Sequence, residues 1–340
     1  METPIRTCFC TPEYFPKLTR FIDEHWRKNH RMARDFDLMK WQHYDLANDR
    51  WNFVLGLKED EIIGILGFID SRRFEREIHD RSLLWLAIWK VREDIRVPGL
   101  GLALRSFLTR EYKADGIGTL GINNTVLPLY KNFGYKTGTL DHFYFVNRHV
   151  KDFRIAKNVK ISTEGEGGKT LFSLDEKSIP AFLERVELSK EIFPAKSLSY
   201  LQNRYARHPV YKYEFLGLVN EVENPSGIFV TRTQVCEDRK VLRIVDFVGS
   251  VSELKGMGSC FETLLMERDL EYVDLLCFGV EEEGLLKSGF QKLKHEGETI
   301  IPNYFEPFLR ENIPIQFAYK YGAKERPLFF KGDGDQDRPN

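Results

Sequence analysis

The chain has 340 residues, of which 42% are hydrophobic and 30% are charged. At about 150 residues per domain this length predicts two domains, each able to bury a core. Lys and Arg number 50 and Asp and Glu number 51, so the formal charge is −1. A near-neutral chain disfavours a nucleic-acid partner, because non-specific binding needs clustered positive charge.

Three further features predict a cytoplasmic protein. The longest apolar run, residues 83–88, is far shorter than the roughly 18 residues of a membrane span, so no membrane partner is expected. The start, Met1-Glu2-Thr3-Pro4, lacks the cationic and apolar regions of a signal peptide. The five cysteines form no Cys-x-x-Cys pair, so neither a disulfide framework nor a metal site is predicted.

The first half of the chain alternates strand and helix patterns. Residues 51–57 and 62–69 are typical of two strands joined by a polar turn at 58–61. Residues 82–91 form an almost uninterrupted apolar run, which predicts a central strand buried on both faces. A glycine-rich turn follows, and then a helix over 100–112 whose apolar residues recur at helical spacing.

Three shorter elements complete this half. They are a strand at 117–122, a helix at 127–132 that ends at Gly134, and a final strand that begins at 144–146. Strands that alternate with helices predict an α/β sandwich rather than a helix bundle.

The domain boundary is predicted in the stretch from residue 147 to residue 171. This stretch contains Glu164-Gly165-Glu166-Gly167-Gly168 and has almost no apolar periodicity. We therefore predict a domain over 1–155 and another over 156–340, both within the usual size range.

One segment of the first half indicates a particular chemistry. Val91 ends the apolar strand, and the turn that follows places Gly99 and Gly101 at the start of the helix. Such a turn directs free backbone N–H groups to one point, where the helix dipole adds partial positive charge, and glycine leaves room for an anion. It predicts a diphosphate site. It is neither the dinucleotide fingerprint, which needs a third glycine, nor a Walker loop, which needs Gly-Lys-Ser/Thr.

The pattern Arg96-x-x-Gly99-x-Gly101 resembles the acyl-CoA pyrophosphate loop of the GNAT superfamily of N-acetyltransferases. Asn123, followed by the run Tyr130-Lys131-Asn132-Phe133-Gly134-Tyr135, is similar to that family's Asn-x6-Tyr-x3-Gly-aromatic signature. The resemblance implies acyl-CoA as co-substrate and no metal. The residues it assigns to CoA binding are Val91, Arg96, Gly99, Leu100, Gly101, Leu102 and Asn123.

The resemblance also implies a mechanism. The pantetheine arm is expected between two splayed strands, here 82–91 and 117–122, whose unpaired edges suit an extended amide-bearing ligand. Tyr130 is expected beside the sulfur of CoA, as the proton donor to the leaving thiolate; the alternative is a helix tyrosine that packs on the core. Asn123 is expected to bond the pantetheine or to cap the following turn.

Two further catalytic candidates lie at the ends of the central strand. Holding the amine and the thioester in line supplies about 7–11 kcal/mol of the barrier, and a general base adds to this unless the amine is already partly neutral. Asp94 is expected to orient the amine or to take its proton through water, with Ser82 at the other end of the strand. A solvated turn acid is the alternative for Asp94.

The second half resembles a degenerate copy of the first. Residues 242–280 repeat the order of strand, glycine turn, helix and strand. Glu253 stands where the first copy has Arg96, and Leu285 stands where it has Tyr130. A carboxylate repels a diphosphate and leucine cannot protonate a thiolate. This copy is therefore expected to form a wall of the acceptor site or an oligomer contact rather than to bind CoA.

Two aromatic and basic segments are candidates for the acceptor pocket. A predicted helical region carries Trp26 and His30, and a compact segment further on carries Tyr205 and His208. Core packing and a solvated face are the alternatives for these segments. The end of the chain, residues 331–340, has spaced aspartates without the Glu of a calcium loop, and is expected to be disordered or to fold back onto the acceptor.

Taken together, these features resemble N-acyltransferases of bacterial surface-polysaccharide pathways. Those enzymes acylate nucleotide-linked amino sugars, such as the dTDP-4-amino-4,6-dideoxyglucose of anthrose biosynthesis. We therefore expect two tandem GNAT-like α/β domains, each a mixed, mostly antiparallel sheet flanked by helices. We expect the first domain to transfer an acyl group from acyl-CoA to such an amino sugar. Whether the chain forms a homo-oligomer stays open.

Two alternatives stay open as well. In the first, the acceptor is a peptide, a protein, a tRNA-linked group or another small amine. The balanced charge of the chain shows no excess of positive charge of the kind that tRNA binding requires. In the second, both copies are non-catalytic scaffolds. The intact Arg96, Gly99, Gly101 and Tyr130 beside an eroded second copy argue against the scaffold.

Overall fold

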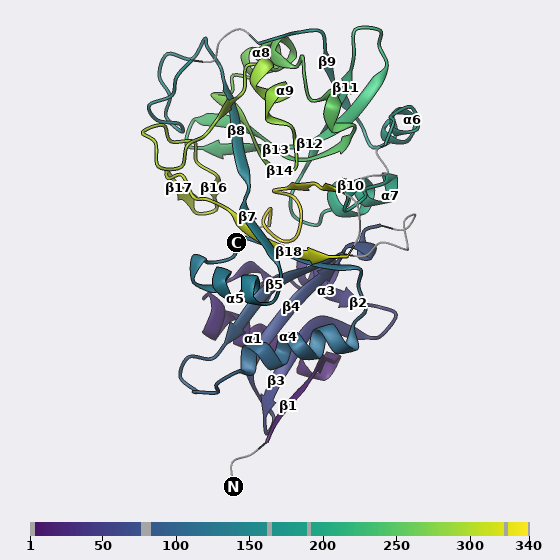
Figure 1. Ribbon diagram of the computed structural model, residues 1–340, viewed down its shortest axis with the longest axis vertical. Coiled ribbons are helices and arrows are strands. Elements are labelled where there is room, and N and C mark those ends of the chain that lie inside the picture. Colours follow the sequence, from purple (N-terminus) through teal and green to yellow (C-terminus); the bar gives the residue numbers. More distant parts are fainter. Residues whose placement is uncertain (1–3, 76–82, 162–164, 189–191, 323–325, 339–340) are drawn as a thin grey trace.

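The computed structural model describes residues 4–75, 83–161, 165–188, 192–322 and 326–338. Figure 1 shows two α/β halves stacked along the long axis of the molecule, with the C-terminal segment between them. Over the described ranges, each half holds a mixed sheet of eight strands flanked by helices. This confirms the predicted fold class.

The first sheet is covered by helices on both faces. Its strand order is β1 (Ile5–Cys10), β3 (Arg50–Lys58), β4 (Glu61–Asp70), β5 (Leu83–Val91), β6 (Gly116–Leu120), β18 (Gln316–Tyr321) and β7 (Lys136–Thr139), with β2 (Tyr44–Asp45) paired to β3. Its helices are α1 (Phe15–Phe21), α2 (Arg31–Arg34), α3 (Phe36–His43), α4 (Leu100–Glu111) and α5 (Leu127–Asn132). Apolar side chains of α1 to α3 pack on one face, and those of α4 and α5 on the other.

The apolar side chains of helix α4 pack directly against glycines of the sheet. A Cβ on Gly56 would come within 2.8 Å of Leu100 Cδ1, and one on Gly64 within 3.1 Å of Leu100 Cδ2. Leu100 and Leu104 are buried at this contact. The glycines of β3 and β4 therefore fix where the N-terminus of α4 sits relative to β5.

The second sheet repeats this order. Its strands are β15 (Gln291–Lys292), β8 (Asp141–Val146), β14 (Tyr272–Phe278), β13 (Arg239–Gly249), β12 (Pro225–Cys236), β11 (Glu214–Val219) and β9 (Thr170–Leu174), with β20 (Phe329–Phe330) paired to β14. Its helices are α6 (Ile179–Leu183), α7 (Leu198–Leu201), α8 (Gly258–Glu267) and α9 (Glu282–Lys287). Two small ribbons pair β10 (Ile192–Phe193) with β19 (Arg326–Pro327) and β16 (Tyr304–Phe305) with β17 (Phe308–Leu309).

The two sheets exchange a strand. β18, from the end of the chain, lies between β6 and β7 of the first sheet, and β8 lies between β14 and β15 of the second. The sequence predicted that the strand beginning near residue 144 is the last strand of the first half. This prediction is wrong, because that strand, β8, belongs to the second sheet. Only Leu140 separates β7 from β8, too short a link for a hairpin, which needs about two loop residues. The chain therefore continues from one sheet into the other, as Figure 1 shows.

The C-terminal tail, residues 328–338, folds back between the halves. Backbone pairing of β13 with β14 ends at Ile244 and Leu275, and beyond this point the two strands diverge. The tail enters the opening: the Lys331 N–H donates to the Leu276 C=O at 3.1 Å, and the Gly332 N–H donates to the Val245 C=O at 2.7 Å. Residues 331–338 are thus ordered and fold back, and their expected contact with an acceptor stays a prediction.

Replacing Gly332 with alanine should lower the free energy of unfolding by about 1–3 kcal/mol, because its Cβ would overpack the opening. That Cβ would lie 2.4 Å from the Tyr205 hydroxyl oxygen and 2.7 Å from the Val245 carbonyl oxygen. Gly322→Ala is the matched control, since its Cβ meets no atom of the described residues within 4 Å. Chemical denaturation of both variants measures the difference; equal stabilities would show that the tail is not seated in the opening.

Candidate active site

The two central strands of the first sheet diverge to form a fork. β5 and β6 are paired in parallel only from Leu83 and Gly116 to Trp85 and Gly118. Beyond this point β5 is paired with β4 alone, up to Val91. We call the opening between residues 86–91 and residues 119–120 the first fork, and the corresponding opening between β13 and β14 the second fork.

A β-bulge explains why β5 turns away from β6. In the pairing of β4 with β5, Leu66 faces Trp89 and Phe68 faces Leu86, so Ala87 and Ile88 together oppose Gly67. A bulge bends its strand and increases the local twist.

At the apex of the first fork, a side chain takes the place of the lost pairing. The Thr119 hydroxyl donates to the Leu86 C=O at 3.3 Å. This contact confirms that the fork begins where the backbone ladder stops, and it agrees with the splayed strands implied by the resemblance.

The turn beneath the first fork has the geometry of an anion cradle. Gly99 has φ +78°, and a Cβ there would meet no atom of the described ranges within 4 Å, which leaves open space beside it. The Ala103 N–H closes the first helical bond to the Gly99 C=O at 3.0 Å. For the N–H groups of Gly101 and Leu102 the described part of the chain shows no backbone acceptor, as expected at a helix start. Exposed Arg96 lies on the same turn.

Tyr130 lies in α5, almost fully buried between Trp89 and Tyr135. Its ring meets Trp89 edge-on at 6.2 Å and Tyr135 at 5.2 Å. Burial, followed by the neighbouring Tyr135, raises the pKa of Tyr130 well above its usual range. The phenol therefore keeps its proton at neutral pH, which is what a proton donor requires.

The carboxylate of Asp94 is placed less favourably for catalysis. It accepts hydrogen bonds from Arg92 Nε at 3.0 Å and from Nη2 at 2.6 Å, and it is exposed. The hydrogen bond from Arg92 lowers the pKa of Asp94 to about 2, so it accepts a proton poorly at neutral pH. The geometry favours the solvated turn acid over a general base. Ser82 lies outside the described residues.

Two roles were expected for Asn123, binding of the pantetheine or capping of the following turn, and the structure shows the capping contact. Its Oδ1 accepts a hydrogen bond from the Thr125 N–H at 3.1 Å at the turn before α5.

Of the four residues predicted to bind the acceptor, Tyr205 and His208 lie together, since the His208 N–H donates to the Tyr205 C=O at 3.2 Å and both rings pack on Tyr213. Trp26 is exposed at the end of the π-turn that follows α1. His30 is buried, and its Nδ1 accepts from the Met32 N–H at 3.2 Å. Burial lowers the pKa of His30 to about 4, so it is neutral at physiological pH. Tyr205 donates to Asp246 at 2.6 Å, and His208 Nδ1 accepts from the Tyr211 N–H at 2.9 Å. The last two side chains have structural roles between the halves.

In the second copy, the chain itself covers the positions that are open in the first. The tail fills the second fork, and the Gly258 N–H at the start of α8 donates to the Glu166 C=O at 3.0 Å. Glu253 forms an ion pair with Lys169. Leu285 is fully buried in the core. The strand edge and the helix start that are open in the first copy are thus already occupied in the second.

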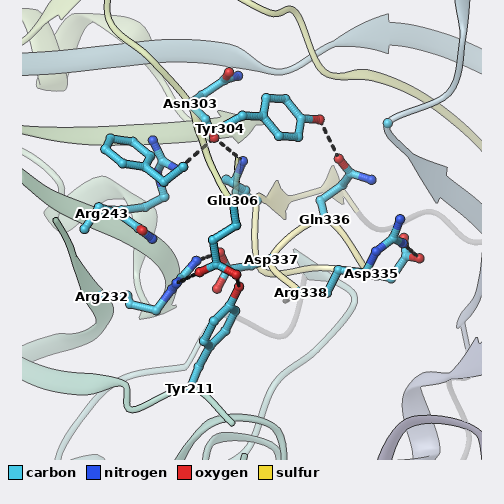
Figure 2. A pocket seen from close by; sticks show the side chains of 14 residues that line it. Tyr211, Arg232, Arg243, Asn303, Tyr304, Glu306, Asp335, Gln336, Asp337 and Arg338 are labelled. Carbon is cyan, nitrogen blue, oxygen red and sulfur yellow. Dashed lines mark hydrogen bonds and ion pairs between the residues drawn. The ribbon is translucent and has the colours of Figure 1, made fainter. Parts of the chain in front are cut away.

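A polar pocket lies between the halves; the sequence predicted an acceptor site walled by the second copy, but not the residues that line this pocket. Its cavity is about 150 Å³, and its walls come from Gly121 after β6, from β12 and β13, from residues 303–306 and from the tail. Figure 2 shows arginine, aspartate and tyrosine side chains converging on it. In the sequence, only the spaced aspartates of the tail pointed to this pocket. Their spacing does not indicate which distant strands they contact. We call it the interdomain pocket.

No helix in the described ranges is long and apolar enough to cross a membrane. The same ranges bring together no group of three His, Cys, Asp or Glu side chains that would hold a metal ion.

Comparison with known proteins identifies the fold. No protein-family model and no curated protein sequence matches the chain. Among solved structures, a GCN5-related N-acetyltransferase from Anabaena variabilis superposes with a TM-score of 0.56 at 12% identity, covering 94% of this chain and 73% of that one. A GCN5-related N-acetyltransferase from Kribbella flavida gives 0.54 at 11% identity, covering 94% and 71%. A "Probable N-Acyltransferase" from Enterococcus faecalis gives 0.57 at 9% identity, covering 94% and 72%.

These likenesses span both halves of the chain, and the sheets show the reason: each has its central parallel pair, its fork and its glycine turn in the same order. The chain has the fold of two tandem GCN5-related N-acetyltransferase domains.

Proposed function

We propose that the chain is an acyl-CoA-dependent N-acyltransferase whose donor site is the first fork and the glycine turn beneath it. One observation carries the proposal. The first fork leaves a strand edge and a helix start open, whereas the second has both covered by its own chain. The names carried by the solved structures with this fold support the same activity.

The residues of the turn suit the diphosphate of CoA. The N–H groups of Gly101 and Leu102 sit at the positive end of the α4 dipole, and Arg96 adds a full charge on the same turn. The open space beside Gly99 leaves room for the phosphates. Residues 86–91 of β5 offer backbone donors and acceptors to the amides of the pantetheine arm.

Bound acyl-CoA would supply the acyl group for direct attack by the acceptor amine, with CoA released as a thiol. Tyr130 holds a proton on its phenol oxygen, ready for the departing sulfur. Because Arg92 keeps Asp94 ionised and weakly basic, the amine must arrive partly neutral or lose its proton to water.

For the acceptor we propose a nucleotide-linked amino sugar, with a peptide, protein or other small amine as the alternative. The polar interdomain pocket beside the first fork supports a polar acceptor. A thiol-release assay with acetyl-CoA and a panel of amino-sugar nucleotides, amino acids and peptides tests both parts. No thiol release with any amine, together with no CoA binding, would overturn the proposal.

Tyr130→Phe should lower kcat by about 10²-fold or more and leave KM for acetyl-CoA nearly unchanged, because only the transition state needs the phenolic proton. Tyr135→Phe is the matched control: it removes a neighbouring hydroxyl that binds Arg105 Nη2 at 3.1 Å. Steady-state thiol release with the best acceptor of the panel measures both. A wild-type kcat in Tyr130→Phe would remove this residue from the mechanism.

Arg96→Gln should weaken CoA binding by roughly threefold to tenfold, with the difference shrinking in high salt as the charge is screened. Glu253→Gln, at the corresponding place in the second copy, should leave CoA affinity unchanged, because that turn is covered. Calorimetric titration of CoA into both variants provides the measurement. Equal affinity of Arg96→Gln and wild type at low salt would contradict the assignment of the turn.

A further inference from the structure

The interdomain pocket lies beside the open first fork. The Gly121 N–H donates to the Gln316 C=O of β18 at 2.7 Å. In a planar trans peptide the C=O points opposite to the N–H, so the Leu120 C=O points away from β18, toward β5 and the fork. Gln336 Nε2, in the pocket wall, donates to this C=O at 3.1 Å. The pocket and the fork therefore share the arm of β6.

One cation in the pocket wall, Lys331, has no carboxylate within ion-pair distance among the residues that the structure describes. Each of the three arginines has a carboxylate: Arg232 pairs with Asp337 at 2.8 Å, Arg243 with Asp274 at 2.7 Å, and Arg338 with Asp335. The rim residue Glu306 also faces Arg232, at 3.5 Å.

Lys331 differs from these arginines. Its Nζ donates to the Asn303 C=O at 2.9 Å and lies 4.7 Å above the Tyr304 ring. Within the described ranges no carboxylate comes within ion-pair distance of it, although the residue is only 3% exposed. A buried ammonium group without an anion is costly, because it has lost its hydration and gained no charge in return.

Two more polar atoms at the pocket are buried without a hydrogen-bond partner in the described structure. They are Asn303 Oδ1, an acceptor, and Arg338 Nε, a donor. Asn303 itself is 1% exposed. Buried polar atoms are nearly always paired in folded proteins, so an unpaired acceptor, an unpaired donor and an uncompensated ammonium around one cavity indicate a missing partner.

We propose that the interdomain pocket binds a carboxylate or phosphate group of the acyl acceptor, with Lys331 as its counter-ion. This inference rests on the proposed acyltransferase function. The anion would pair with Lys331 and accept from Arg338 Nε, while a hydroxyl or amine next to it would donate to Asn303 Oδ1. A cavity of about 150 Å³ is large enough for a carboxylate or phosphate group.

The charges around Lys331 make binding dependent on pH. Burial, and then the neighbouring Arg243, lowers the pKa of Lys331 to about 7. Asp337 and Asp274 act in the opposite direction, and Arg232 acts in the same direction as Arg243. An anion at Nζ would bring the pKa back toward the usual value of about 10.4. The affinity for the anion should therefore be highest below pH 7, where Lys331 is already protonated. Above pH 7, binding should be accompanied by proton uptake at Lys331, and the affinity should fall by about tenfold per pH unit toward pH 9.

Isothermal titration calorimetry on the full chain tests this without an acyl donor. The probes are two matched pairs, glycine against glycinamide and glucosamine 6-phosphate against glucosamine. Titrations at pH 6 and pH 8, in two buffers of different ionisation enthalpy, count the protons. At least one anionic probe should bind and its neutral partner should not. For glycine, proton uptake should be roughly 0.9 per anion at pH 8 and roughly 0.1 at pH 6. For glucosamine 6-phosphate the count is made at pH 8 only, because its phosphate group itself titrates near pH 6.

Lys331→Gln should weaken binding of the anionic probe at least tenfold and abolish the proton uptake. Lys320→Gln is the control, an exposed lysine that donates to the Phe133 C=O at 2.9 Å. Because the proton count is also measured on the wild type, the test does not depend on the variant folding. Binding of the carboxylate probe alone identifies an amino-acid-like acceptor, and binding of the phosphate probe alone identifies a sugar phosphate.

Failure of both anions to bind, or binding without proton uptake, would overturn the assignment of the pocket. These outcomes are separable from failure of the proposed function. If acetyl-CoA is turned over and neither anion binds, only the pocket assignment fails. If the anions bind through Lys331 and CoA does not bind at all, the acyltransferase proposal fails and the anion site stands alone.

Discussion

The architecture depends on how each sheet satisfies the backbone groups that are left unpaired where two parallel strands diverge. Unpaired N–H and C=O groups inside a protein raise its free energy. The unpaired groups of a fork are therefore expected to bond either to another segment of the chain or to a ligand. In the second sheet Lys331 and Gly332 fill it through their own N–H groups. In the first, the Thr119 hydroxyl spans the apex and Gln336 of the tail bonds the Leu120 C=O, which leaves the edge of β5 open. One fold thus contains one closed and one open copy of the same feature.

The exchanged strands make the two copies interdependent. β8 carries His142 into the second sheet, where His142 Nε2 lies 3.0 Å from Asp274, the carboxylate that also pairs with Arg243. β18 in turn completes the first sheet beside the open fork. Because the tail follows β18 in sequence, the segment that closes the second fork also reaches the pocket beside the first. Filling one copy and shaping the other are consequences of the same chain path.

The region around the tail, including the interdomain pocket, concentrates buried charge where hydrophobic packing would be the ordinary solution. Tyr213 donates to Asp337 at 2.7 Å, and Lys196 pairs with both Asp246, at 2.6 Å, and Asp333, at 3.1 Å. These buried charges are paired, as stability requires. Lys331 departs from that rule, and it does so at the cavity wall rather than in the packed core. The exception and the cavity coincide, which is why we assign them a common role.

The sequence by itself determined the features that depend on neighbours along the chain. The strand that ends at Val91, the glycine turn and helix α4 follow from local periodicity and backbone freedom, and so does the substitution of Tyr130 by Leu285 in the second copy. Only the tertiary structure decided which strands exchange, that the tail fills the second fork, and that Tyr205 and His208 pack between the halves instead of facing a ligand. These outcomes depend on pairing between segments up to hundreds of residues apart. Because the backbone groups of a strand edge are the same in every strand, they do not determine which segment pairs with them.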